Sequence, residues 1–130
     1  QEMSFARVRV RNEILPMMEK EIGPGISKAL ARTSRILRED ADALDLIAGD
    51  LFASLADPTQ IPIELIAEVP SAVRKRVIKQ AIEAMGAPTL TAEQILEVDA
   101  LVAAWKGQGP VALAGGITAR RDSGRLTLSK

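Results

Sequence analysis

The longest regular pattern of hydrophobic residues lies in the first half of the chain. From residue 26 to about residue 55, mostly apolar side chains recur at alternating steps of four and three, which is the spacing of one face of an α-helix. The positions of this stripe are Leu30, Ser34, Leu37, Ala41, Leu44, Ala48, Leu51 and Leu55. The pattern predicts one amphipathic helix of about 30 residues, about 45 Å long, that ends at Asp57-Pro58.

A shorter helical pattern precedes this stripe. Phe5, Val8 and Leu15 recur at helical spacing and predict a helix from Ser4 to about Leu15. Pro16 either breaks this helix or opens a second one that runs to about residue 22. The sequence Gly23-Pro24-Gly25 then indicates a loop before the long helix.

Two further helices are predicted after the long one. The first begins at Pro70 or Ser71 and ends at Met85, with Gly86 where a left-handed cap is expected. The second opens at Thr91, which forms a capping box with Gln94, and stops at Gly107. We expect this second helix to turn a set of apolar side chains inward: Ile95, Val98, Leu101, Val102 and Trp105.

The end of the chain changes to short extended runs. Residues 111–113, 117–121 and 125–128 are separated by Gly-rich turn sequences, and they predict a three-strand antiparallel meander. Ile61-Pro62-Ile63 is also expected to be extended because of its proline. The predicted fold class is therefore mostly α with a small antiparallel β element (α+β). We predict a single domain over 1–130, in four parts: 1–22 (an Arg-rich linker helix), 25–57 (the long helix), 61–106 (a second helical part) and 109–130 (the β meander).

Composition narrows the function classes. The chain has 130 residues, 47% of them hydrophobic and 26% charged, as is usual for one globular domain. It contains no His, Cys or Tyr, which excludes His-based triads, Cys nucleophiles and the usual zinc sites. No run of about 18 apolar residues could span a membrane, and the first residues do not form a signal peptide. Because the chain begins with Gln, we expect it to be a piece of a longer protein. We expect that protein to be cytoplasmic.

The net charge of zero conceals three blocks. Residues 1–38 hold eight bases and four acids, a net charge of +4. Residues 39–69 hold eight acids and no base, a net charge of −8, and residues 70–130 hold nine bases and five acids, a net charge of +4. Such blocks indicate a surface that meets an anion and another that avoids it, although clustered charge also serves solubility.

The bases form three clusters that could contact RNA phosphates. They are Arg7, Arg9 and Arg11; Arg74, Lys75, Arg76 and Lys79; and Arg120, Arg121 and Arg125, with Lys28, Arg32 and Arg35 as a weaker group. Because the chain has only three aromatic residues, we expect phosphate and shape recognition and not base stacking. Folding should then bring the basic stretches to one side and turn the acids away from the RNA.

Arg74 has an unusual position within its cluster. A helical projection places it near the middle of the apolar arc that contains Val77 and Ile78. It either extends its head group to solvent from the first turn or pairs with an acid of the long helix. We favour the pairing, because eight acids lie in the preceding stretch.

No catalytic constellation is visible in this sequence. It has no phosphate-binding glycine loop, and the acids at residues 39–45 are interpreted as a solvated helix face. The helix start at Ile26 could hold an anion, but we favour the interpretation that the preceding glycines simply form a loop between two helices.

Four segments together resemble a known family. Residues 5–16, Phe-Ala-Arg-Val-Arg-Val-Arg-Asn-Glu-Ile-Leu-Pro, are similar to the segment after the catalytic domain of tRNA(Ile)-lysidine synthetases. Residues 30–41 resemble the long helix that follows, and residues 69–78 resemble the Leu-Pro-x-x-x-Arg-x-Arg segment of the substrate-binding region. Residues 109–128 resemble its closing strands. The order of these segments, which covers the whole chain, carries the resemblance.

The resemblance implies a role for the chain within a larger enzyme. The family uses ATP to adenylate the wobble cytidine of an isoleucine tRNA and then joins lysine to it. Its Ser-Gly-Gly-x-Asp-Ser loop is absent here, so we expect the chain to be inactive alone and to lack a cofactor or metal. ATP and Mg would belong to the N-terminal catalytic domain.

The expected partners are tRNA and that N-terminal catalytic domain of the same polypeptide, and a homodimer stays open. The alternative function is a helical protein–protein interaction module that uses the long helix. The residues expected to contact tRNA are Arg7, Arg9, Arg11, Arg74, Lys75, Arg76, Lys79, Arg120, Arg121 and Arg125.

Overall fold

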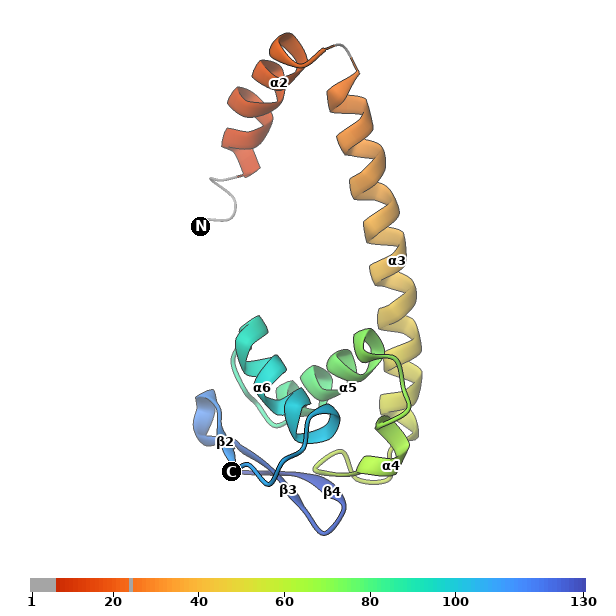
Figure 1. Cartoon of the computed structure of the whole chain (residues 1–130), viewed down its shortest axis with the longest axis vertical. Helices are drawn as coiled ribbons and strands as arrows, with labels where there is room; N and C mark the ends of the chain where they lie inside the picture. The colour runs from red at the N-terminus through yellow and green to blue at the C-terminus, as the bar shows by residue number, and fades with distance from the viewer. Residues whose placement is uncertain (1–6, 24) are drawn as a thin grey trace. The chain divides into compact units, whose positions relative to one another are not determined.

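The computed structural model describes residues 7–23 and 25–130, and it is mostly helical with a small antiparallel sheet (Figure 1). The predicted fold class is confirmed. The elements in chain order are the π-helix η1 (Val10–Ile14), α2 (Leu15–Glu21), α3 (Ile26–Ser54), β1 (Gln60–Pro62), α4 (Ile63–Ile66), α5 (Ser71–Ala84), α6 (Ala92–Ala103), β2 (Val111–Ala112), the 3-10 helix η2 (Ala114–Gly116), β3 (Thr118–Asp122) and β4 (Arg125–Ser129).

The chain divides into two compact units, with the boundary inside α3. They are the N-terminal unit, Gln1–Asp42, and the C-terminal unit, Ala43–Lys130. The predicted helix start at Ser4 and the inward position of Phe5 lie outside the described residues, as does Pro24 of the predicted loop.

In the N-terminal unit, Pro16 lies in the first turn of α2. This confirms that the proline opens a second helical segment and does not end the helical path. Proline is tolerated there because the first N–H groups of a helix have no intrahelical acceptor. The preceding five residues form the π-helix η1, so the two segments join through a turn with wider hydrogen-bond spacing.

The start of α3 is held by a carboxylate of the preceding helix. Glu19 accepts hydrogen bonds from the backbone N–H of Ser27 at 2.9 Å and of Gly25 at 2.5 Å. These bonds, chiefly the one from Ser27, lower the pKa of Glu19 below its usual value. The helix start considered above as an anion site is thus occupied by the chain's own anion.

The apolar stripe of α3 has different surroundings along its length. In the C-terminal unit, Ala48 is fully buried against Val73 and Val77 of α5. In the N-terminal unit, Leu30 and Leu37 are 37% and 63% exposed. The predicted long helix is confirmed, but only its last turns contribute to a core.

The sheet of the C-terminal unit has the strand order β1-β4-β3-β2, and each pair is antiparallel. The tight β3–β4 turn uses positive φ angles at Ser123 and Gly124, as a type I′ hairpin requires. The three predicted strands form the expected meander. The extended backbone at Ile61 and Pro62 is also confirmed, whereas Ile63 is not extended and begins α4. The pairing of Ile61 with Leu126 as a fourth strand was not predicted.

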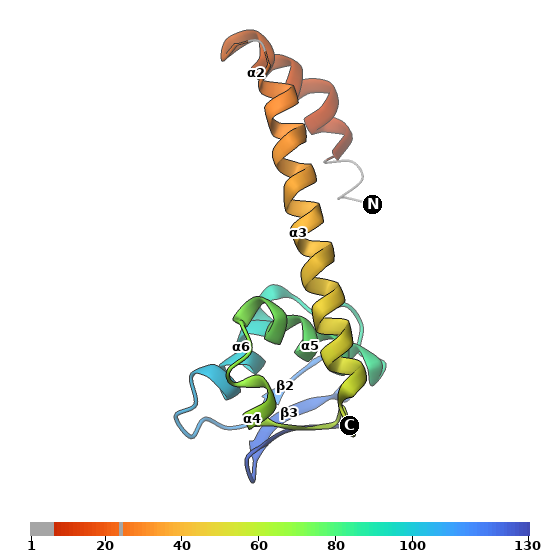
Figure 2. The same cartoon turned by 90° about the vertical axis from the view of Figure 1, so that its right-hand side faces the viewer.

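Helices α5 and α6 lie on one face of this sheet (Figures 1 and 2). Their apolar residues, such as Ile78 and Leu101, join sheet residues such as Ala119 and Leu126 in one buried cluster. Burying each such aliphatic side chain stabilises the fold by about 1.5–3 kcal/mol. The C-terminal unit therefore has its own hydrophobic core.

The predicted helix signals of this unit are confirmed with one exception. Thr91 and Gln94 form the capping box of α6, and Gly86 has a φ of 92° after α5. Trp105 was expected to point inward, but it follows the end of α6 and is 41% exposed. That prediction is wrong because the helix ends at Ala103 and no longer directs the indole toward the core.

Candidate nucleic-acid interface

Arg74 is a buried part of the α5–α6 contact. Its Nε donates to Asp99 Oδ1 at 2.5 Å and its Nη2 to Asp99 Oδ2 at 3.1 Å, while Nη1 donates to the Val69 carbonyl. The predicted pairing of Arg74 with an acid of the long helix is wrong, because this face of α5 packs against α6. The bonds to Asp99 raise the pKa of Arg74 further and outweigh its burial.

The next basic side chains of α5 are partly exposed and meet acids. Arg76 Nε donates to Asp45 Oδ1 of α3 at 2.7 Å, and Lys79 lies 3.8 Å from Glu83. Together with Gln80, these four residues line a polar hollow of about 550 Å³. An acid of the long helix therefore does pair with this cluster, but through Arg76 and not Arg74.

Lys75 differs from its neighbours. Among the residues that the structure describes, no carboxylate oxygen lies within 4.0 Å of its Nζ, and the side chain is partly exposed. It also lines a second, apolar hollow between α5 and α6.

The third cluster is distributed over both faces of the β3–β4 hairpin. Arg120 lies 3.9 Å from Asp122, and Arg125 donates to the Gln60 side chain at 3.2 Å. Arg121 donates to the Leu101 carbonyl at 3.1 Å, and its guanidinium lies 5.1 Å from the centroid of the Trp105 ring. Arg121 thus helps to fix the end of α6, where a cation also complements the helix dipole.

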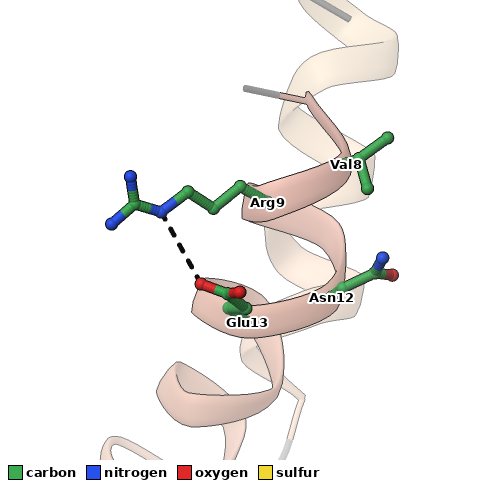
Figure 3. Close-up of a pocket in the computed structure, with 4 residues that line it drawn as sticks. All are labelled: Val8, Arg9, Asn12 and Glu13. Atoms are coloured by element: carbon green, nitrogen blue, oxygen red, sulfur yellow. Dashed lines mark ion pairs between the residues drawn. The ribbon is translucent and has the colours of Figure 1, made fainter. Parts of the chain in front are cut away.

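The first cluster lies in the N-terminal unit and is exposed. Figure 3 shows Arg9 reaching toward Glu13 one turn away, with 3.6 Å between Arg9 Nε and Glu13 Oε2. Val8 and Asn12 complete a shallow pocket of about 440 Å³. The remaining basic residues of this unit named above are also exposed: Arg7, Arg11, Lys28, Arg32 and Arg35.

The expected separation of bases from acids is wrong within the C-terminal unit. Carboxylates lie beside four of its predicted contact residues: Asp99 beside Arg74, Asp45 beside Arg76, Glu83 beside Lys79 and Asp122 beside Arg120. Burial and pairing favour acids near arginines irrespective of their place in the sequence. Charge blocks along the chain therefore do not define a purely cationic face here.

The described residues contain neither a metal-binding cluster nor a membrane-spanning helix. Within residues 7–23 and 25–130, no group of three or more acidic, His or Cys side chains is arranged to hold a metal ion. No helix in the same ranges is long and apolar enough to cross a bilayer.

The fold and this surface define a mostly helical α+β domain whose cations are partly exposed and partly ion-paired. A family model described as the TilS substrate binding domain matches residues 62–127, which extend from the end of β1 into β4. The chain belongs to the TilS substrate-binding domain family, and the resemblance given above is confirmed.

Proteins named tRNA(Ile)-lysidine synthase are similar to nearly the whole chain. The proteins of Nocardia farcinica and Rhodococcus erythropolis are 45% and 43% identical to it, over 97% and 95% of the chain. The protein of Streptomyces coelicolor is 42% identical over 96%. The chain spans only 41%, 40% and 36% of these relatives, respectively. It corresponds to an accessory part of such a protein.

The sequence contains a signal for the Arg74–Asp99 pair beyond the predictions made above. Asp99 follows Val98 and precedes Leu101, so an acid interrupts the apolar face of α6 just as Arg74 interrupts that of α5. Two opposite charges at apolar positions of consecutive helices indicate a buried pair. The carboxylate of Glu19 at the start of α3 has no comparable sequence signal.

Proposed function

We propose that the chain is the tRNA-binding accessory domain of an ATP-dependent tRNA(Ile)-lysidine synthetase. The observation that carries this proposal is the match of residues 62–127 to the TilS substrate binding domain. The names and the greater length of the relatives support the same assignment. In the complete protein, a separate catalytic domain would adenylate the wobble cytidine of the isoleucine tRNA and join lysine to it.

The contribution of this chain is to bind and orient the tRNA. The candidates for phosphate contact in the C-terminal unit are the exposed or partly exposed cations: Lys75, Arg76, Lys79, Arg120, Arg121 and Arg125. In the N-terminal unit, Arg7, Arg9 and Arg11 are candidates near the junction with the catalytic domain. Arg74 supports α5 from within and is left out of the contact surface, because its guanidinium is buried on Asp99.

The mixed charge of this surface limits the affinity expected of the chain alone. Every carboxylate beside a contact residue both occupies that cation and repels phosphate. Because binding releases counterions from the tRNA, the logarithm of the binding constant should fall linearly with the logarithm of the salt concentration. The expected slope is about −0.9 per phosphate contact on a duplex. About four contacts would give a slope near −4.

The test is a titration of labelled tRNA(Ile) with the 130-residue chain at several salt concentrations, followed by fluorescence anisotropy. The expected result is a linear loss of affinity with a slope near −4. A matched pair of variants locates the contact: Lys79→Glu should weaken binding, whereas Leu65→Gln on α4 should not. Absence of tRNA binding at low salt would contradict the proposal.

A protein-interaction function is the second candidate, and one observation favours it. Ile36 and Leu37 of α3 are 50% and 63% exposed, and exposed apolar residues in a row often mark a protein contact. The same salt series separates the two functions. A partner bound through this apolar face would show little salt dependence, and Leu37→Asp would abolish its binding while leaving tRNA affinity unchanged.

A further inference from the structure

The C-terminal unit has a small apolar groove between α5 and α6 that its core does not fill. Ala92, Ile95 and Leu96 of α6 form its apolar part, and Lys75, Arg76 and Lys79 of α5 form its rim. Its volume is about 270 Å³, slightly below the roughly 300–1,000 Å³ of pockets for drug-sized ligands. Leu96 is 52% exposed in it.

Both walls of the groove are fixed by hydrogen bonds already described. The two bonds between Arg74 and Asp99 join α5 to α6, and Asp99 lies one helical turn after Ile95. At the other end, the capping box of Thr91 and Gln94 sets the start of α6. The groove is thus preformed, which lowers the entropic penalty of binding a ligand.

The rim is cationic, and two of its cations have either no ion pair or only a weak one. Lys75 has no carboxylate within ion-pair distance among the described residues. The Lys79–Glu83 pair is 3.8 Å long and nearly half exposed, so it contributes little and can exchange for a phosphate. An apolar hollow with such a rim complements a ligand that is apolar on one part and anionic on the next.

We propose that this groove binds one unpaired nucleotide of RNA, an inference that rests on the proposed tRNA-binding function. The base lies against Leu96 and Ile95, and its flanking phosphates contact Lys75 and Lys79. Arg76 also lines the groove, while its guanidinium is held by Asp45.

The size of the groove favours a nucleotide over an acidic protein helix. A helix docked in a groove is anchored by apolar residues over two turns or more, at positions i, i+3, i+4 and i+7. Here the apolar part is restricted to three residues within five positions of α6. One base fills such a hollow, and the phosphates on either side match the cations of its rim.

The experiment compares two RNA hairpins of identical stem, one blunt and one with unpaired nucleotides at its 3′ end, as ligands of the 130-residue chain. The unmodified chain should bind the overhanging hairpin about five- to tenfold more tightly. Leu96→Asp and the milder Leu96→Gln should remove this gain, and Leu96→Gln, which adds no charge, should leave the affinity for the blunt hairpin unchanged. The matched control Leu65→Asp, at a residue 50% exposed on α4, should keep the gain.

The charged rim is tested in the same way. Lys75→Glu should remove most of the overhang gain, whereas Lys106→Glu, on the loop after α6, should preserve it. Emission of the single tryptophan, Trp105, verifies that each variant retains the fold at the other end of α6.

Each result has a distinct meaning. If the overhang adds no affinity, or if Leu96→Asp and Leu65→Asp behave alike, the groove proposal is overturned while binding of the blunt hairpin leaves the tRNA-binding function standing. If the Leu96 variants bind both hairpins normally but lose binding to the catalytic domain of a relative, the groove is a protein site and the proposal is overturned. If the unmodified chain binds neither RNA, both proposals fail.

Discussion

The two halves of helix α3 carry one hydrophobic pattern in two different environments. In residues 43–54, Ala48 is fully buried, and Leu44 and Leu51 pack against the same cluster. In residues 26–42, Leu37 is 63% exposed, and Ala41 alone among the stripe residues of this described segment is partly buried. Periodicity therefore identifies which face of a helix is apolar, but it does not say what covers that face.

The same contrast holds for charge. Arg74 and Asp99 form a buried pair in the C-terminal unit, whereas Arg9 and Glu13 form an exposed pair within one helix. The exposed pair is four positions apart in the sequence, whereas the members of the buried pair are 25 positions apart. Removing one partner is expected to cost far more in the buried pair than in the exposed one, because the remaining charge is left desolvated without a partner.

The largest effect is expected from a substitution that breaks the buried Arg74–Asp99 pair. Arg74→Met leaves Asp99 buried without a partner and should lower the free energy of unfolding by about 3–5 kcal/mol. The double variant Arg74→Met/Asp99→Leu should recover most of that loss. Urea denaturation measures both, with Arg9→Met as the exposed control that changes stability by at most about 0.5 kcal/mol. Equal losses in Arg74→Met and Arg9→Met would contradict the contrast.

The next largest effect is expected from a pair of variants that compares the two halves of α3 directly. Ala48→Leu inserts three carbon atoms where Val73 and Val77 already fill the space, and it should destabilise the chain by about 1–3 kcal/mol. Ser34→Leu adds a similar volume at an exposed position of the same stripe and should change stability by at most about 0.5 kcal/mol. Thermal unfolding of both variants is the measurement. A stable Ala48→Leu variant would show that the last turns of α3 are not tightly packed.

A smaller effect concerns the balance of charge on α5. Asp45→Asn removes the partner of Arg76 and should change stability by at most about 1 kcal/mol. It should also strengthen tRNA binding about two- to threefold and steepen the salt slope, because Arg76 becomes available to phosphate. Asp42→Asn, in the N-terminal half of α3, is the control for the loss of one negative charge. If both variants gain the same tRNA affinity, the gain is due to the change in net charge and not to the release of Arg76 from its ion pair.

The smallest effect depends on pH. Because hydrogen bonds lower the pKa of Glu19 in the folded chain, its contribution to stability is present above its unfolded pKa and is lost as pH falls through the lower, folded value. As pH falls, the Gly25 and Ser27 amides should therefore lose protection from exchange, measured relative to the intrinsic exchange rate at each pH. Glu19→Gln should remove that additional pH dependence, while exchange within α5 stays unchanged. An unaltered profile in Glu19→Gln would exclude the carboxylate as the cap.

Local signals made much of the fold predictable. The stripe of α3, the capping box at Thr91 and the glycine after α5 each act within a few residues, so the corresponding helix bounds were nearly correct. The pairing of β1 with β4 and the partner of Arg74 depend on residues 65 and 25 positions apart. No local pattern specifies the strand pairing, and the Arg74–Asp99 pair is indicated only when the apolar faces of two consecutive helices are compared.

The candidate site was less predictable than the fold. The helical projection set Arg74 apart from the other basic residues of α5, but the sequence reasoning did not find that Arg74 is buried on Asp99 while Lys75 beside it stays partly exposed. Nor could it show that Leu96 and Lys79, from different helices, line one groove. Both distinctions arise from helix packing in three dimensions.

Amide hydrogen exchange of the 130-residue chain, with and without tRNA(Ile), tests the central claim most directly. If the C-terminal unit binds the tRNA, exchange should slow in α5 and in the first turns of α6. Residues 26–42 of α3 should change little. Slowing confined to residues 26–42, or no slowing in α5 at tRNA concentrations that saturate binding, would contradict the account.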